Sequence, residues 1–319
     1  MNFFAPIIGQ PQAVELLHSA ISQNRIAPAY LFTGAEGIGR SLTARCFVEQ
    51  LFCQPLPIAE QTIIQNRLRQ GTHPDLLWVQ PTYLYQGQRY SATEATEKKL
   101  KRKAPPIIRT EQIREIAQFL SRRSAIASRS VVVIEKAETM AESAANALLK
   151  TLEEPGQATL ILIAPSAESL LPTLVSRCQK VPFYRLSPEA LAQVLGQTGN
   201  DFSTHPAILA TCQGSPGKAI SAVQICQEVP SQLLQSLEQL PQSSLRNALE
   251  LARQVSSLEL EVQLWLLDYL QQQYWQQFLS GNISFPSLAE LEKARKHLLS
   301  FVQPRLVWEV TLMEFSAIN

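Results

Sequence analysis

Short runs of consecutive apolar residues alternate with helical patterns along the first half of the chain. The four runs are residues 30–32, 76–79, 131–134 and 159–163. Between them, apolar residues recur at helical spacing, as at Ile113, Ile116 and Leu120. Strands that are apolar throughout and alternate with helices indicate a parallel sheet covered on both faces. We therefore predict an α/β domain.

The helix that follows the run at 131–134 has a predicted start and stop. Thr139 and Glu142 have the spacing of a capping box. Pro155 and Gly156 are expected to end that helix.

After about residue 181 the pattern changes, and only helical periodicity remains. Residues 214–217 contain two glycines and a proline, which break one short helix and start another. One apolar stripe further on consists of Leu233, Leu234, Leu237 and Leu240. The predicted parts are an α/β domain at 1–182, a small helical domain at 183–228 and an all-α domain at 229–319.

Composition excludes several classes of protein. The net charge is +1 and only 17% of residues are charged, so no overall field attracts nucleic acid or membranes. The five cysteines are widely spaced and predict neither a metal centre nor a disulfide framework. The N-terminus lacks a signal peptide, and no apolar run reaches about 18 residues, the length of a membrane span. We therefore expect a cytoplasmic protein.

A glycine-rich loop after the first apolar run is the most informative motif. From Gly34 to Ser41 the sequence is GAEGIGRS, which fits the phosphate-binding pattern Gly-x-x-x-x-Gly-Lys-Ser except at Arg40. Backbone amides of such a loop, here including Gly37 and Gly39, form an anion cradle at a helix N-terminus. Ser41 keeps the hydroxyl that ligates magnesium. A planar guanidinium, however, is larger than the ammonium that normally grips the phosphates.

The apolar run at 131–134 ends in an acid and a base. Glu135 stands where an ATPase has an aspartate for magnesium, and its side chain is one methylene longer. Lys136 replaces the acid that orients the attacking water, and it repels the metal ion. Three states of the loop remain open: empty or weakly liganded, bound to ATP or ADP without turnover, and hydrolytically active. Hydrolysis is the least favoured, and no cofactor is certain.

Two further motifs carry charge. Arg177, between Ser176 and Cys178, follows a short predicted helix, where an arginine commonly complements the helix dipole. A basic run ends a polar segment over 83–106 that we expect to be irregular, and it is either a solvated loop or a phosphate-contacting patch. The run consists of Lys98, Lys99, Lys101, Arg102 and Lys103.

Five motifs, in order, resemble the clamp-loader branch of the AAA+ superfamily, and within it the delta-prime subunits of bacterial DNA polymerase III. They are RIAPAYLFTG at 25–34, THPD at 72–75, NALLKTLEEP at 146–155, LVSRCQ at 174–179 and VQPRL at 302–306. The resemblance covers nearly the whole chain. It implies an AAA+ P-loop domain with a parallel sheet, a small helical lid domain and an α-helical collar domain.

The resemblance also implies a role. Such subunits belong to a five-membered complex that opens a ring-shaped sliding clamp and places it on primed DNA. Its motor subunits, tau or gamma, split ATP, and a delta subunit is a further partner. The chain would be a non-hydrolysing stator without intrinsic ATPase activity. Arg177, with Ser176 before it, would be an arginine finger offered in trans to a neighbouring ATPase subunit.

Two positions depart from the family pattern. Relatives carry four clustered cysteines for zinc, whereas Cys53 stands alone here, so zinc is not expected. Motor subunits carry a sensor arginine about where Gly217 stands, and its absence agrees with a disabled site. Two other functions remain open: an ATP-hydrolysing motor subunit of the same class, and a DNA-binding accessory module that works through the basic run.

Overall fold

The chain divides into two compact units, Met1–Val194 and Leu195–Asn319, which are described separately. The computed structural model describes residues 2–98, 100, 104–154, 156–197, 212–240, 244–281 and 288–316. The division into three domains expected from the sequence stays a prediction.

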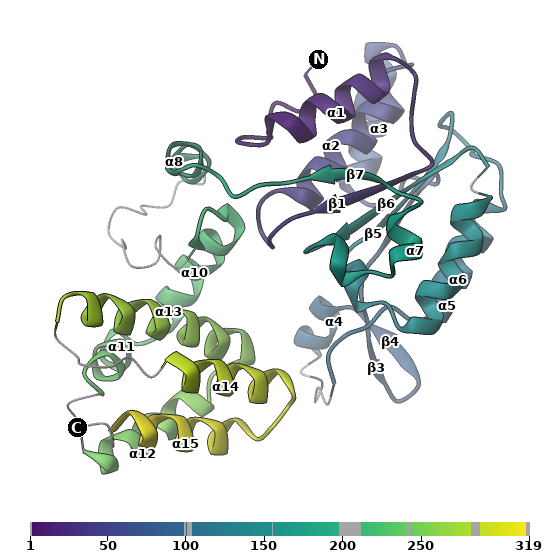
Figure 1. Ribbon diagram of the computed structural model, residues 1–319. Coiled ribbons are helices and arrows are strands. Elements are labelled where there is room, and N and C mark those ends of the chain that lie inside the picture. Colours follow the sequence, from purple (N-terminus) through teal and green to yellow (C-terminus); the bar gives the residue numbers. More distant parts are fainter. Residues whose placement is uncertain are drawn as a thin grey trace. The chain divides into compact units, whose positions relative to one another are not determined.

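A five-stranded sheet with the order β2-β5-β6-β1-β7 is the centre of the first unit (Figure 1). Every adjacent pair of its strands is parallel. The strands are β1 (Ala29–Thr33), β2 (Leu76–Val79), β5 (Ser130–Ile134), β6 (Ala158–Ala164) and β7 (Gln179–Pro182). The predicted parallel α/β domain is therefore confirmed. The pattern missed β7, because this edge strand is largely polar and buries only Val181 fully.

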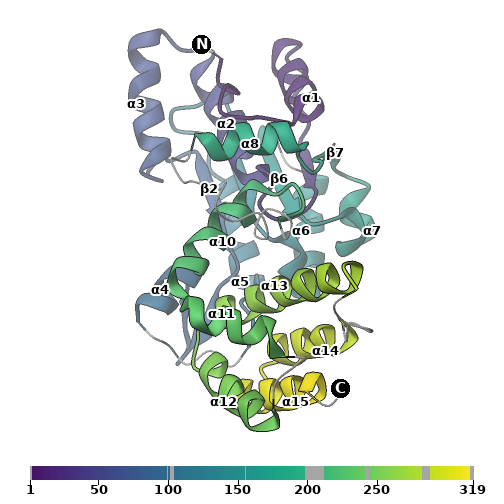
Figure 2. The same ribbon diagram turned by 90° about the vertical axis from the view of Figure 1, so that its left-hand side faces the viewer.

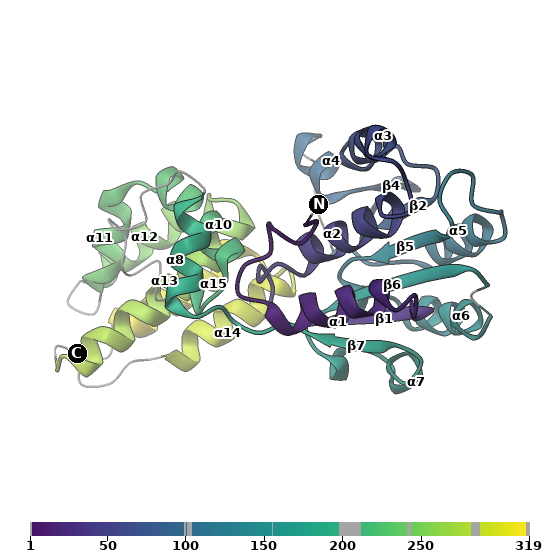
Figure 3. The same ribbon diagram turned by 90° about the horizontal axis from the view of Figure 1, so that it is seen from above.

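Alternate residues of the strands face two separate cores. Phe32, Val133 and Ile161 belong to one core, with side chains of α1 (Pro11–Ser22), α2 (Arg40–Cys53) and α3 (Ile58–Arg69). Leu31, Val132 and Leu160 belong to the other, with side chains of α5 (Thr110–Leu120), α6 (Glu142–Glu153) and α7 (Pro172–Val175). In the view from above, α1 and α2 lie over the sheet (Figure 3). Burial on both faces explains why the central strands are apolar throughout.

The predicted capping box at the start of α6 is wrong. The residue that caps this helix is Ala141, whose side chain makes no capping hydrogen bond. Thr139 instead lies in a short 3-10 helix, η1 (Ala137–Thr139), where its hydroxyl donates to the carbonyl of Lys136 at 2.7 Å. The cap is Ala141 instead of Thr139, so α6 begins two residues later than the pattern indicated.

The polar segment after β2 is not irregular in its described part, which corrects the expectation for residues 83–106. It forms a hairpin of β3 (Tyr83–Tyr85) and β4 (Gln88–Tyr90), followed by α4 (Ala92–Glu97). The hairpin turn is Gln86-Gly87, and both residues have positive φ, 49° and 79°. Two residues of this conformation form the tight turn that matches the twist of a hairpin.

In the described part of the second unit, all of the regular structure is helical, as predicted. α12 and α15 lie side by side (Figures 1 and 2). Two buried polar groups of this unit are paired: the Trp308 indole donates to Gln263 at 2.8 Å, and the Tyr274 hydroxyl donates to the carbonyl of Leu237 at 2.7 Å. The helices include α10 (Pro216–Glu228), α11 (Ser231–Glu238), α12 (Leu245–Ser256), α13 (Leu260–Leu279), α14 (Leu288–Leu299) and α15 (Pro304–Ser316), and α8 (Pro188–Gly196) spans the boundary between the units. No helix in the described ranges is long and apolar enough to cross a membrane.

The THPD motif has a structural role. The carboxylate of Asp75 is buried and accepts hydrogen bonds from the backbone amides of Ala125, Ile126 and Ala127, at 2.6, 2.7 and 2.7 Å. The imidazole of His73 accepts from the amide of Asp75 at 3.2 Å. One aspartate thus fixes the loop between α5 and β5, 50 residues further along the chain.

We expect Asp75→Asn to lower the free energy of unfolding by about 3 kcal/mol, because an amide accepts fewer of these bonds than a buried carboxylate does. Asp268→Asn is the matched control. Its carboxylate pairs with Arg295 at a partly exposed position, where such pairs contribute about 0–1 kcal/mol. Urea denaturation of both variants measures the difference. Equal, small effects would show that the loop does not depend on Asp75.

Candidate functional site

The glycine-rich loop joins the carboxyl end of β1 to the N-terminus of α2. Gly34 has φ 149°, and a Cβ there would lie 2.6 Å from the carbonyl oxygen of Phe183. Gly39 has φ 102° and directly precedes α2. A side chain is strained at both positions, so the loop keeps the backbone requirements of a phosphate cradle.

Arg40 is engaged by the protein itself. Its side chain donates a hydrogen bond to the carbonyl of Ala164, the last residue of β6. Burial lowers the pKa of the Arg40 guanidinium, and the carboxylate of Glu138 acts in the opposite direction. The residue that replaces the phosphate-gripping lysine is therefore tied to the edge of the sheet.

Lys136 also has a partner within the site. Its ammonium lies 3.1 Å from a carboxylate oxygen of Glu36, in the middle of the glycine loop. Burial opposes the charged form of Lys136, but the carboxylates led by Glu36 outweigh it and raise its pKa. Burial raises the pKa of the nearby Glu138, which Arg40 and Lys136 partly offset. The ammonium thus stays charged beside the loop.

Glu135, expected at the position of a magnesium ligand, is hydrogen-bonded to a neighbouring side chain. Its carboxylate accepts a hydrogen bond of 2.6 Å from the side-chain amide of Gln80, just after β2. In the described part of the chain, no cluster of three or more histidine, cysteine or acidic side chains is arranged to hold a metal ion.

A cavity of about 280 Å³ lies between the loop and the ends of the strands. Three carboxylates and two cationic side chains line it. The phosphates of a nucleoside triphosphate that enters the cavity are repelled by those carboxylates. They must also compete with the carboxylates for the two cations. The lining residues are Glu36, Gly37, Gly39, Arg40, Ser41, Leu42, Glu135, Lys136, Glu138 and Ile163.

The structure thus brings together most of the nucleotide-site residues expected from the sequence: Gly37, Gly39, Arg40, Ser41 and Glu135 all line this cavity. Sequence reasoning missed the part played by Glu36. An acid at a variable position of the glycine loop was the available signal, but its partner became visible only in the fold.

Arg177 lies two residues beyond the end of α7 and does not line the cavity at the loop. One terminal nitrogen of its guanidinium donates to the carbonyl of Thr173 at 3.0 Å. The other donates to a carboxylate oxygen of Glu153 at 2.9 Å. The hydroxyl of Ser176 also donates to the carbonyl of Thr173, at 3.1 Å. The Arg177 side chain remains 38% exposed, so a partner molecule has access to it.

Only one residue of the basic run lies within the described part of the chain. The ammonium of Lys98 stands 4.6 Å from the centre of the Tyr90 ring, a cation–π contact that ties the end of α4 to β4. Lys99, Lys101, Arg102 and Lys103 lie outside the described residues. Contact of this run with DNA stays a prediction.

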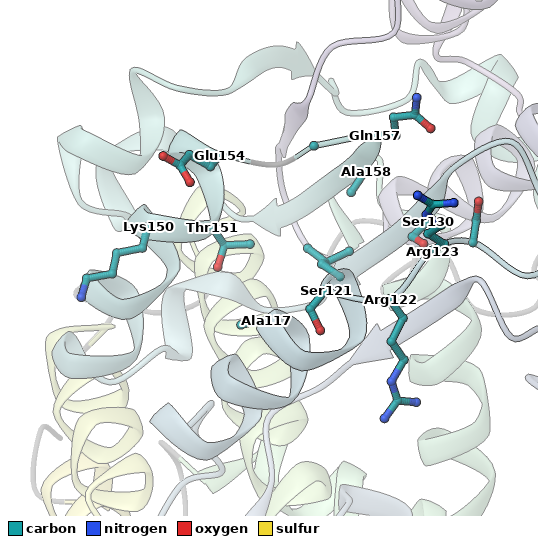
Figure 4. Close-up of a pocket in the computed structure, with 13 residues that line it drawn as sticks. Ala117, Ser121, Arg122, Arg123, Ser130, Lys150, Thr151, Glu154, Gln157 and Ala158 are labelled. Atoms are coloured by element: carbon teal, nitrogen blue, oxygen red, sulfur yellow. The ribbon is translucent and has the colours of Figure 1, made fainter.

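A larger cavity, about 820 Å³, lies at the opposite edge of the sheet, where β5 and β6 begin (Figure 4). It is bounded by the C-terminal ends of α5 and α6. The charged side chains of Arg122, Lys150 and Glu154 extend from it in different directions and do not converge (Figure 4). None of the expected site residues lines this cavity, so we assign the candidate chemistry to the loop and to Arg177.

The parallel sheet, with a glycine loop between its β1 strand and the following helix, defines the class of the protein. The first unit has a P-loop α/β fold, as the sequence predicted.

A sequence profile described as "DNA polymerase III, delta subunit" matches residues 9–187, more than half of the chain. A second, described as "Cyanobacterial DNA polymerase III delta prime, C-terminal domain", matches residues 189–315. The chain therefore belongs to the DNA polymerase III delta and delta-prime subunit family.

Individual relatives agree with this family. The chain is 31% identical over 215 residues to the DNA polymerase III subunit delta' of Bacillus subtilis, and the match covers 66% of this chain and 58% of the relative. It is 36% identical over 178 residues to the subunit delta' of Pseudomonas aeruginosa, covering 53% and 48%. The chain thus matches about half of the length of these relatives. A more distant match is the DNA polymerase III subunit tau of Bacillus subtilis, 24% identical over 192 residues and covering 59% and 30%.

Among solved structures, the chain is similar to a DNA polymerase III gamma subunit-related protein from Thermotoga maritima. The TM-score is 0.48 at 19% identity, over 96% of this chain and 99% of the other. It is also similar to the RuvB Holliday junction branch migration motor of Thermotoga maritima, with a TM-score of 0.40 at 14% identity over 69% and 62%.

We expect Glu36→Ala to strengthen the binding of magnesium-ATP to the purified chain about fivefold, because it removes a carboxylate that holds Lys136. Charges about 4 Å apart at a protein surface interact by about 1–4 kcal/mol. A tenfold change in a binding constant corresponds to about 1.4 kcal/mol. Calorimetric titration measures the affinity. Glu60→Ala, at an exposed position in α3, is the control. Unchanged affinity in Glu36→Ala would show that the ion pair does not restrict the site.

Proposed function

We propose that this chain is the non-hydrolysing delta-prime subunit of a cytoplasmic DNA polymerase III clamp loader. In that complex it acts as a stator that helps to place a sliding clamp on primed DNA. Its partners are the ATPase subunits tau or gamma, the delta subunit and the clamp. Family membership and the names of the relatives support the complex. The internal pairing of the loop's charged residues is the observation that carries the passive role.

Hydrolysis of ATP needs a cation on the β- and γ-phosphates, a carboxylate on magnesium and a group that orients water. Here Arg40 binds the end of β6, and Glu135 binds Gln80. Lys136 pairs with Glu36 and brings a positive charge to the place where magnesium would sit. Each of the three requirements is therefore unmet by the chain's own loop.

Arg177 differs from Arg40 and Lys136 in its position and in its available hydrogen-bond donors. It lies outside the loop's cavity, is partly exposed and keeps unused N–H donors. These properties support a role as an arginine finger that reaches the γ-phosphate held by a neighbouring ATPase subunit. Such a finger accelerates phosphoryl transfer by about 10³- to 10⁵-fold.

The second unit supplies surface for assembly in this proposal. Several large apolar side chains of its helices are exposed, among them Leu306 and Val310, one helical turn apart on α15. Exposed apolar side chains grouped on a helix are typical of surfaces that bind other proteins. We propose that residues 183–228 form a small helical lid domain and that residues 229–319 form a collar domain. The second unit, Leu195–Asn319, contains the collar and most of the lid.

The isolated chain should release no phosphate from magnesium-ATP above the background of the preparation, since its loop lacks the three groups that hydrolysis needs. A phosphate-release assay on the purified chain checks this. Turnover that disappears in Arg40→Ala would instead establish an ATP-hydrolysing motor subunit, the alternative of the same class.

The chain should stimulate ATP turnover by its ATPase partner, and Arg177→Ala should abolish that stimulation while the complex still forms. The expected loss at the site that receives Arg177 is about 10³-fold or more. Phosphate release and size-exclusion chromatography measure turnover and assembly. Arg185→Ala is the control, since this exposed arginine follows β7, away from α7. Full stimulation by the Arg177→Ala chain would contradict the finger role.

A further inference from the structure

The guanidinium of Arg177 is held by two elements of the fold. Thr173, in α7, supplies a backbone carbonyl at 3.0 Å, and Glu153, the last residue of α6, supplies a carboxylate oxygen at 2.9 Å. Each contact uses a different terminal nitrogen. A guanidinium carries five N–H donors, so three of them remain for another acceptor.

Glu153 joins two motifs that are separate in the sequence. It belongs to the NALLKTLEEP run at 146–155, and Arg177 to the LVSRCQ run at 174–179. α6 and α7 pack against each other. Glu153 and Arg177 are 24 positions apart with β6 between them, so the fold returns the chain to the same place. The pairing gives the NALLKTLEEP motif a specific structural partner, the LVSRCQ motif.

The ion pair between Glu153 and Arg177 can orient the guanidinium and still leave it able to bind another anion. The side chains of Arg177 and Glu153 are 38% and 52% exposed. Exposed ion pairs are weak, so the guanidinium keeps its affinity for a stronger anion such as a terminal phosphate. A free arginine side chain, by contrast, samples many rotamers and loses them when it binds.

We propose that Glu153 is a positioning residue, which holds Arg177 in the orientation in which its remaining donors meet the γ-phosphate of a neighbouring subunit. This inference rests on the proposed function of Arg177. Glu153 itself touches neither nucleotide nor magnesium in this arrangement, and it acts only through the guanidinium.

The test is a double-mutant cycle in the complex of this chain with its ATPase partner. Glu153→Ala should lower the maximal stimulated turnover about two- to fivefold, the factor expected for an exposed ion pair. The KM for ATP and the assembly of the complex should not change. Glu153→Gln should retain at least about half of the stimulation, since its amide oxygen still accepts from Arg177.

In the Arg177→Ala background, Glu153→Ala should have no further effect, because there is no guanidinium left to position. Glu154→Ala is the matched control and should behave as the unmodified chain. Its side chain is also exposed and makes no ion pair with any residue in the described ranges. Thermal unfolding of each variant shows whether the fold is intact.

The outcomes separate the two proposals. Full stimulation by Arg177→Ala overturns the finger role, and the positioning role with it. Loss of stimulation in Arg177→Ala together with unchanged stimulation in Glu153→Ala overturns the positioning role alone. An additional loss from Glu153→Ala in the Arg177→Ala background also overturns it, because Glu153 would then act independently of Arg177.

Discussion

The charged groups that line the loop's cavity lie at the carboxyl ends of β1, β5 and β6, the central strands of the parallel sheet, which are buried almost throughout. β1, β5 and β6 are neighbours, and their carboxyl ends lie together. The loop after β1, the residues after β5 and the last carbonyl of β6 are therefore within contact distance. Because the strands are packed on both faces, the backbone at this edge is held in place.

Because of that geometry, the two cationic side chains beside the loop contact groups of the protein itself. Arg40 reaches the carbonyl of Ala164, and Lys136 reaches Glu36. A nucleotide would have to replace these contacts and also approach three carboxylates. The backbone of a P-loop is thus retained, with glycine at the strained positions, while the side chains satisfy one another. Retention of the loop is consistent with its packing role between β1 and α2.

In the proposed function, Arg177 lets a chain with a non-hydrolysing loop contribute to the chemistry of a neighbouring subunit. It is carried by the helices on the other face of the sheet, and its contacts leave donors available. In that proposal, the cation that acts on a partner is partly exposed, whereas Arg40 and Lys136 are engaged within the chain. The proposed division of roles is compatible with membership of the delta and delta-prime family, whose more distant relatives include a DNA polymerase III subunit tau.

By itself the sequence determined the elements with strong local patterns: the apolar strands β1, β5 and β6, the glycine loop and the helical second unit. The polar edge strand β7, the hairpin of β3 and β4 and helix α3 escaped it, because their patterns are short or weak. It also identified Arg40, Lys136 and Arg177 as unusual residues. Only the tertiary structure decided what each one binds. Most of their partners lie far along the chain, as with Arg40 and Ala164, which are 124 positions apart, and such contacts form only when the sheet is assembled.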